Sequence, residues 1–226
     1  MPTKPIGYVV SLCDLTGNMV RPWAEAGYEC WCVDIQHSIR RDKVVKVGAG
    51  AIRFVWGDIR SWTPPRGLRF DLLVNQSPCT HVAVSGARDF AKKRGYLLRE
   101  ALELFEAGRA AAEWHGCRWV AENPVGVMSG VPHIGKPDHY FNPSDYTGWE
   151  PRDNYTKKTC IWCGNGFLMP PPRPDPSLGP PDDRIHKTPP SKDRGNVRSA
   201  APLGFARAVF AANHPAIQAD RGRTCP

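Results

Sequence analysis

Short apolar runs alternate with segments of helical periodicity along the first two-thirds of the sequence. Six of these runs have the length and composition of buried strands: residues 8–13, 30–35, 51–56, 70–75, 118–122 and 159–164. Strands that alternate with helices are typical of a mostly parallel sheet covered by helices on both faces. The pattern therefore predicts an α/β domain.

Three segments have the pattern of helices. A short one at 21–26 is followed by glycine, which commonly ends a helix, and a long one at 91–114 carries an apolar stripe. A third is predicted at 203–213. From residue 214 onward, a proline and two arginines predict a frayed tail.

The composition changes towards the end of the chain. Nine prolines stand between residues 170 and 190, which excludes a helix or a central strand there. We divide the chain into a catalytic α/β domain at 1–169, a proline-rich segment at 170–197, and residues 198–226, whose helix completes the catalytic domain. The proline-rich segment is predicted to be an extended loop.

Polar and reactive residues stand at the carboxyl ends of the predicted strands. Asp14, Asp34 and Asp58 follow three of the strands, and Cys79 and Glu122 stand at the ends of two more. Ligands of open parallel sheets bind beyond the carboxyl ends of the strands, so this edge is the candidate site. Each aspartate would also suit a plain turn, and Cys79 alone would suit a buried structural thiol.

Charge and hydropathy indicate which kinds of binding partner to expect. A net charge of +8 and a pI of about 9.2 favour a polyanion such as DNA. No run of eighteen apolar residues occurs, which argues against a membrane span. We expect a monomer in the cytoplasm. Four tryptophans are assigned to the core: Trp23, Trp31, Trp56 and Trp119.

The eight cysteines raise the question of disulfides or a metal. They are scattered through apolar segments of a chain large enough to fold without cross-links, which favours reduced thiols. Cys160 and Cys163 have the spacing of half a zinc site, but no second pair accompanies them and their segment alternates as a strand does. The sequence therefore predicts no metal site.

Two short motifs indicate a family. Ser77-Pro78-Cys79-Thr80-His81 follows one predicted strand, and Glu122-Asn123-Pro124 follows the next. Together they resemble the cytosine-5 DNA methyltransferases, in which a Pro-Cys motif holds the nucleophile and a Glu-Asn motif binds the target base. The segment 77–88 is similar to a compact branch of this family from phages and bacteria, and the resemblance covers about residues 10–213.

The resemblance implies a Rossmann-like fold of the S-adenosylmethionine-dependent methyltransferases, with Cys79 and Glu122 as catalytic residues. It implies double- or single-stranded DNA as the substrate, and leaves restriction, protection from restriction and phage genome masking open as the biological role. Further substrate-binding residues would be Pro78, His81, Arg88, Asn123, Pro124 and Lys158.

The same resemblance implies S-adenosylmethionine as the cofactor. Asp34 matches the acid that holds the ribose hydroxyls, and Asp58 matches the acid near the adenine amino group. A final motif around Gly204 would close the cofactor pocket. The residues expected to line the cofactor are Asp14, Leu15, Thr16, Gly17, Asp34, Ile35, Asp58, Ile59, Gly204 and Phe205.

The chain departs from the family's pattern in three places. Asn18 and Met19 stand where more glycine is expected, so the methionine end of the cofactor would be held differently. Phe205 replaces an asparagine close to the transferred group, which leaves a modified donor such as carboxy-S-adenosylmethionine as an alternative. The target-recognition region is reduced to 170–197, which indicates short or relaxed sequence specificity, or a single-stranded substrate.

Cytosine chemistry explains the two catalytic residues. Carbon 5 is a poor nucleophile, and a thiolate that adds to carbon 6 makes it electron-rich. We expect backbone amides and positive neighbours to favour the Cys79 thiolate. A protonated Glu122 would donate to ring nitrogen 3 and accept from the exocyclic amine. In a duplex the base must first leave the stack.

Two other functions fit the same sequence. One is a catalytically inactive homologue that binds DNA or a partner, which the shortened glycine turn favours. The other is an enzyme that modifies free cytidine nucleotides, which the reduced recognition segment favours and the positive net charge disfavours.

Overall fold

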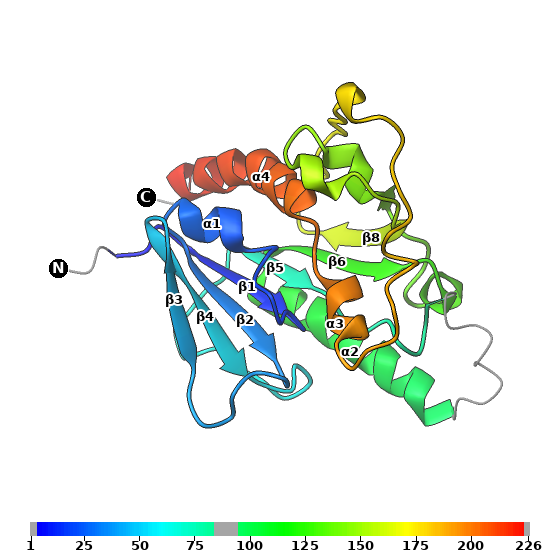
Figure 1. Ribbon diagram of the computed structural model, residues 1–226. Helices are drawn as coiled ribbons and strands as arrows, with labels where there is room; N and C mark the ends of the chain where they lie inside the picture. Colours follow the sequence, from blue (N-terminus) through cyan, green and yellow to red (C-terminus); the bar gives the residue numbers. More distant parts are fainter. Residues whose placement is uncertain (1–3, 84–94, 224–226) are drawn as a thin grey trace.

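An eight-stranded mixed sheet forms the centre of the protein, whose computed structural model describes residues 4–83 and 95–223 (Figure 1). The strand order is β3-β4-β2-β1-β5-β6-β8-β7. The strands are β1 (Tyr8–Leu12), β2 (Glu29–Asp34), β3 (Lys43–Val47), β4 (Gly50–Trp56), β5 (Leu72–Asn75), β6 (Arg118–Pro124), β7 (His139–Phe141) and β8 (Thr159–Gly164).

Five of these strands run parallel. β1 pairs with β2 and β5, β2 also pairs with β4, and β5 also pairs with β6. The remaining pairings, β3 with β4, β6 with β8 and β7 with β8, are antiparallel. The carboxyl ends of β1, β2, β4, β5 and β6 therefore meet at one edge of the sheet, where their arrowheads lie in Figure 1.

Helices cover both faces of the sheet. α1 and α4 lie together on one face and α2 lies on the other, whereas α3 lies near the carboxyl ends of the strands (Figure 1). The α-helices are α1 (Arg21–Glu25), α2 (Gly95–His115), α3 (Arg194–Ser199) and α4 (Leu203–Arg223). The 3₁₀ turns are η2 (Val127–Gly130), η3 (Pro143–Tyr146), η4 (Pro151–Asp153) and η5 (Pro176–Leu178).

The alternation of side chains along each strand divides the core into two layers. In β1, Val9 packs in the layer that contains Trp23 of α1, and Val10 packs in the layer that contains Phe105 of α2. Burying each such side chain stabilises the fold by about 1.5–3 kcal/mol. The predicted mostly parallel sheet with helices on both faces is confirmed.

All six predicted strands are present, with ends shifted by two residues at most. Two further strands were missed. β3 alternates lysine with valine at the outer edge of the sheet, and exposed lysines are a common protection of edge strands against pairing with other chains. β7 has only three residues. Neither offers the apolar run on which the prediction depended.

The predicted tail after residue 213 is wrong, because α4 continues to Arg223. Pro215 removes one backbone donor from the helix, which costs stability. Packing compensates for this loss: Ile217 is 4% exposed in the layer of α1, and His214 stacks on Phe210 with ring centroids 4.8 Å apart. The short α3 was also missed. The predicted start of the long helix at residue 91 lies outside the described residues.

Three of the four tryptophans assigned to the core are buried. Trp56 is 41% exposed, so its assignment to the core is wrong. It is the last residue of β4 and lies at the exposed carboxyl edge of the sheet. The seven cysteines that the structure describes are free.

The proline-rich segment is extended, as predicted, and backbone hydrogen bonds fix it to the residues before β8. The Gly148 amide donates to the Arg173 carbonyl, and the Thr156 amide donates to the Asp182 carbonyl, each over 2.8 Å. The Arg173 guanidinium lies 5.1 Å from the centroid of the Trp149 ring. This segment is therefore anchored along its length.

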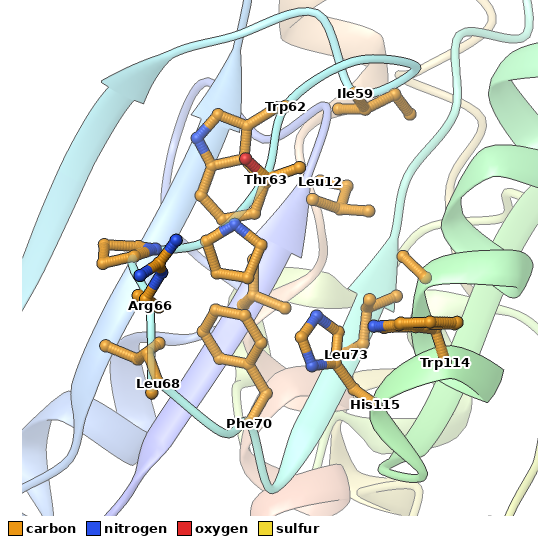
Figure 2. A pocket seen from close by; sticks show the side chains of 15 residues that line it. Leu12, Ile59, Trp62, Thr63, Arg66, Leu68, Phe70, Leu73, Trp114 and His115 are labelled. Atoms are coloured by element: carbon orange, nitrogen blue, oxygen red, sulfur yellow. The ribbon is translucent and has the colours of Figure 1, made fainter.

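The connection between β4 and β5 contains no helix: residues 57–71 form a loop. A cavity of about 380 Å³ lies between this loop, β1, β5 and the end of α2, as Figure 2 shows. Trp62, Phe70 and Trp114 contribute to its largely apolar wall. The cavity lies on the α2 face of the sheet. Of the predicted site residues, only Ile59 lines it.

Within the described residues no helix combines the length and apolarity needed to cross a membrane.

Candidate active site

One buried carboxylate organises the turn after β1. Asp14 is 2% exposed, and its Oδ1 accepts hydrogen bonds from the amides of Thr16 and Gly17 at 2.9 and 2.7 Å. Gly17 has a φ of +71°, and a Cβ there would lie 3.2 Å from the Phe54 ring. Leu15 is half-buried in the same turn. Asp14 therefore shapes the turn that the sequence assigns to the cofactor.

A chain of hydrogen bonds joins this turn to the segment that follows β5. The Gln76 side-chain amide donates to the Ser11 hydroxyl over 2.9 Å, and that hydroxyl donates to Asp14 Oδ2 over 2.8 Å. The Gln76 backbone amide also donates to the Leu12 carbonyl. The network therefore fixes the candidate cofactor turn to the segment that leads to Cys79.

Three aspartates converge on Cys13, directly after β1. Burial raises the pKa of the Cys13 thiol, and the negative charges of Asp34, Asp58 and Asp14 raise this pKa further. A carboxylate acts on a buried thiol in this way only from nearby. The structure therefore brings together the acids that end β2 and follow β1 and β4.

The carboxylates of Asp34 and Asp58 are in different environments. Asp34 is 7% exposed, and its Oδ1 accepts the Gln36 amide over 2.7 Å. Asp58 is partly exposed and accepts hydrogen bonds from the Arg60 guanidinium on both oxygens, which lowers its pKa. Asp34 thus offers a buried acceptor, whereas Asp58 is already paired. Ile35 beside them is exposed.

Cys79 lies in a tight turn after β5. Its carbonyl accepts the amides of Val82 at 3.0 Å and Ala83 at 2.9 Å, and its thiol is half-buried. Pro78 immediately before it is exposed. The nucleophile predicted from the sequence is therefore half-buried and packs against the core layer that contains Phe105 of α2.

Three charged side chains and burial set the pKa of the Cys79 thiol. Burial raises its pKa most, and the charge of Glu122 raises it further, whereas Lys157 and Arg198 lower it. The pKa remains above the ordinary value of a thiol. The expected contributions are present, because a backbone hydrogen bond and the two basic side chains lower the pKa of the thiol, but burial and Glu122 outweigh them.

The end of β6 is tied to the Cys79 loop. Asn123 is fully buried, and its side-chain amide donates to the Ser77 carbonyl over 3.0 Å and approaches the Ser77 hydroxyl at 3.3 Å. Glu122, half-buried, precedes it, and half-buried Pro124 ends the strand. Because β5 and β6 are neighbours in parallel register, Glu122 and Cys79 leave adjacent strands at the same edge.

Gly126 brings the two loops into close contact. The Val127 amide donates to the Val82 carbonyl over 2.9 Å, and Gly126 forms a bridge with Ala83. A Cβ at Gly126 would lie 2.0 Å from the Val82 oxygen, which is far inside van der Waals contact. A side chain at this position would separate the loops that carry the candidate catalytic residues.

We expect Gly126→Ala to lower the free energy of unfolding by about 1–3 kcal/mol, the usual cost of overpacking a close contact. Denaturant unfolding followed by tryptophan fluorescence measures this change. Gly130→Ala is the matched control, because a Cβ at Gly130 meets nothing within 4 Å. Equal stability of the two variants would contradict the packing role of Gly126.

The other predicted substrate residues differ in burial and in their contacts. His81 is half-buried, and its Nδ1 is buried with no hydrogen-bond partner among the described residues. Lys158 is exposed, with its ammonium 5.1 Å from the Tyr140 ring centroid. Lys157, its neighbour, is the lysine that acts on Cys79. Arg88 lies outside the described residues.

The start of α4 is packed closely against the segment around η3 and η4. Gly204 donates its amide to Asp153 Oδ2 over 2.7 Å, and a Cβ at Gly204 would lie 2.6 Å from the Tyr146 carbonyl oxygen. Phe205 is 3% exposed and stacks on Phe141 with ring centroids 3.9 Å apart. The final predicted motif is therefore held in place by contacts with Phe141, Tyr146 and Asp153.

A small cavity lies between this motif, the turn after β1 and the end of β6. Met19, Phe205, Gln76 and Glu122 are among the residues that line it. It connects residues of the predicted cofactor site with the predicted catalytic glutamate. Apart from Gln76 and Glu122 its wall is apolar.

We expect the alkylation rate of Cys79 by iodoacetamide at pH 7 to be lower in the folded protein than in the unfolded chain. Burial first, and Glu122 second, disfavour the reactive thiolate. The rate should rise about tenfold per pH unit until the raised pKa is passed. Peptide mass spectrometry measures the alkylation rate of Cys79 from about pH 6 to about pH 10, which roughly spans the titration of a thiol. A rate that is flat with pH would mean that the thiol is already ionised.

Three residues of this site escaped the sequence interpretation: Ser11, Gln76 and Arg198. Gln76 could have been found, because it stands in the strand-end segment just before the Pro-Cys motif. The choice between Lys157 and Lys158 depends on the side to which each side chain points, and two adjacent lysines do not reveal it. Arg198 gave no signal, because it lies after the proline-rich segment on a helix that was not predicted.

Fold and strand-end residues together define a class. The mixed sheet with a parallel core, the helices on both faces and the acids at the carboxyl edge form a Rossmann-like α/β fold.

Solved structures with this fold show a distant likeness to the chain. A prophage-encoded E. coli protein assigned as a DNA modification methyltransferase is 16% identical, with 70% of this chain and 46% of that protein covered and a TM-score of 0.46. The glycopeptide N-methyltransferase MtfA bound to S-adenosyl-L-homocysteine is 12% identical, with coverage of 62% and 50% and a TM-score of 0.30.

The chain spans about half the length of these two proteins. No protein-family profile and no curated protein matches it.

Proposed function

We propose that this protein is an S-adenosylmethionine-dependent transferase that modifies carbon 5 of cytosine in DNA through a covalent bond to Cys79. One observation carries the proposal: Cys79 and Glu122 leave neighbouring parallel strands at one edge, and Glu122 is close enough for its charge to raise the pKa of the Cys79 thiol beyond the effect of burial. A thiol and a carboxyl group so arranged can act on one pyrimidine ring.

The residues beside this pair fit the cofactor. The buried carboxylate of Asp34 suits ribose hydroxyls, and the ordered turn from Asp14 to Gly17 suits the methionine part of the molecule. Asp58 would have to share its carboxylate with Arg60 to reach the adenine. When bound, S-adenosylmethionine supplies an electrophilic methyl group.

Cys79 provides the nucleophile. Its thiol gives its proton to a water molecule as sulfur bonds to carbon 6 of cytosine. The electrons of the carbon 5–carbon 6 double bond then form a carbon 4–carbon 5 double bond, and nitrogen 3 takes a proton from Glu122, which leaves an enamine with an electron-rich carbon 5. Lys157 and Arg198 stabilise the negative charge on sulfur, since both lower its pKa. After carbon 5 has gained the new group, its proton leaves to a water molecule, the double bond re-forms and sulfur departs.

Glu122 serves the nitrogen side of the ring. In its protonated form it donates to nitrogen 3 as negative charge develops there, and its other oxygen accepts from the exocyclic amine. Asn123, buried and bonded to Ser77, fixes the direction of Glu122 relative to the Cys79 loop. Asn123 is therefore a positioning residue in this proposal.

The cavity wall around Phe205 indicates which group is transferred. Phe205, Met19 and Phe141 give the cavity beside Glu122 an apolar surface. An apolar surface suits a methyl group and offers nothing to pair with the extra carboxylate of carboxy-S-adenosylmethionine. We therefore propose methyl rather than carboxymethyl transfer. The base would enter from single-stranded DNA or after flipping from a duplex.

Nucleoside mass spectrometry tests the proposal. The purified protein is incubated with S-adenosylmethionine and either single-stranded or duplex DNA, which is then digested to nucleosides. The expected result is a deoxycytidine that is heavier by one methyl group.

Three other results would overturn parts of the proposal. A mass shift of any other size would replace the methyl donor, and a shift on dCMP alone would replace DNA as the substrate. Unmodified DNA that the protein nevertheless binds would identify an inactive homologue.

A further inference from the structure

The short helix α3 carries two arginines on one face. Arg194 and Arg198 are four residues apart and therefore share one face of the helix. Val197, on another face, is 55% exposed. The Nε atoms of both arginines are buried and have no hydrogen-bond partner among the described residues. A buried donor without an acceptor lowers the stability of the fold, so we expect a ligand to supply an acceptor at this face.

Contacts on both sides hold α3 across the carboxyl edge of the sheet. The Asn196 side chain exchanges two hydrogen bonds with Gln36, just after β2, at 3.0 and 3.4 Å. Directly after α3, the Ala201 carbonyl accepts the Asn18 side-chain amide over 3.2 Å. Figure 1 shows α3 beside the strand ends. The helix thus spans the site from the cofactor side, and Arg198 lies near Cys79.

Other arginines of this chain are paired with carboxylates. Arg60, Arg152 and Arg184 each form an ion pair with an aspartate or glutamate. No such ion pair of Arg194 or Arg198 is found within residues 4–83 and 95–223. Guanidinium groups bind phosphate oxygens through two parallel hydrogen bonds, and two arginines one helical turn apart present two such forks.

We propose that Arg194 and Arg198, together with Lys157, bind the phosphate of the nucleotide whose base enters beside Cys79. The inference rests on the proposed function, because it takes Cys79 as the place of the base. A phosphate has two possible sources, a DNA backbone or a free cytidine nucleotide, and the experiment separates them.

Equilibrium binding provides the test. Fluorescence anisotropy with a labelled single-stranded oligonucleotide, and calorimetry with dCMP, are run on Arg194→Gln, Arg198→Gln and the double variant. All are made in a Cys79→Ser background, so that catalysis plays no part. Lys192→Gln is the matched control, since it removes one exposed charge from the same segment. Thermal unfolding verifies that each variant is folded.

We expect each arginine variant to weaken oligonucleotide binding about tenfold and to lower the slope of log affinity against log salt by about 1. Lys192→Gln should change affinity less than about twofold, and the affinity for S-adenosylmethionine should stay unchanged. A loss for dCMP alone would assign the site to the phosphate of a free nucleotide, a loss for the oligonucleotide alone would assign it to the DNA backbone, and equal losses would show that it binds the same phosphate in both.

Two results would overturn the inference: wild-type affinity of folded arginine variants for both ligands, or a loss confined to S-adenosylmethionine. Failure of the proposed function is a separate result. It would leave the arginine-dependent phosphate binding intact, and no modified deoxycytidine would form with the wild-type protein.

Discussion

Replacing Cys79 by serine is expected to abolish group transfer to cytosine, with a fall in rate of more than about 10⁴-fold. A serine hydroxyl has almost the same size as the thiol, so the turn closed by the amides of Val82 and Ala83 should persist. A hydroxyl in this half-buried position is a far weaker nucleophile towards carbon 6. Mass spectrometry of deoxycytidine in treated DNA measures the loss.

A trapping experiment adds the covalent step. DNA that contains 5-fluorodeoxycytidine cannot lose a proton from carbon 5, so the bond to sulfur should persist and give a protein–DNA complex that survives denaturation. Peptide mapping should find the adduct on Cys79. Cys163→Ser is the matched control, since Cys163 is also a half-exposed free thiol. Continued transfer by Cys79→Ser, or an adduct on another cysteine, would refute the covalent role.

Much of the fold could be predicted because apolar runs mark buried parallel strands regardless of what surrounds them. The same logic placed the acids and the thiol at one edge, since parallel strands share a direction. It failed where packing between distant segments decides the outcome. β3 is a strand through pairing with β4, and α4 passes Pro215 because Ile217 is buried.

The candidate site was predictable in its residues and less so in its electrostatics. Pro-Cys and Glu-Asn motifs identify a nucleophile and an acid, but they do not reveal that burial raises the pKa of Cys79. Nor does the sequence show that Arg60 already holds Asp58, or that Tyr146 and Tyr155, in a region that could have offered stacking surfaces for a base, are buried. Each depends on neighbours from other elements.

The environment of the thiol also explains how the site would avoid side reactions. A raised pKa keeps Cys79 protonated and unreactive at neutral pH. Binding of the base would lower the barrier to attack by sulfur, because Glu122 donates a proton to nitrogen 3 and so neutralises the negative charge that addition creates there. Activation of the nucleophile would then depend on the presence of the correct ring.

Glu122→Gln separates these two roles of the glutamate. The amide can still donate to nitrogen 3 and accept from the exocyclic amine, so DNA affinity should change little. It has no acidic proton to transfer, and we expect kcat to fall about 10²–10³-fold. Single-turnover transfer, followed by nucleoside mass spectrometry, measures this rate. Glu25→Gln, an exposed change on α1, is the control.

The same variant should make the thiol more reactive. Removing the negative charge of Glu122 lowers the pKa of Cys79, so alkylation by iodoacetamide at pH 7 should be faster than in the wild-type protein. A faster thiol combined with slower transfer is the signature of an acid that acts on the ring and not on the nucleophile. If alkylation and transfer both slowed, Glu122 would instead be required to keep the Cys79 loop in place.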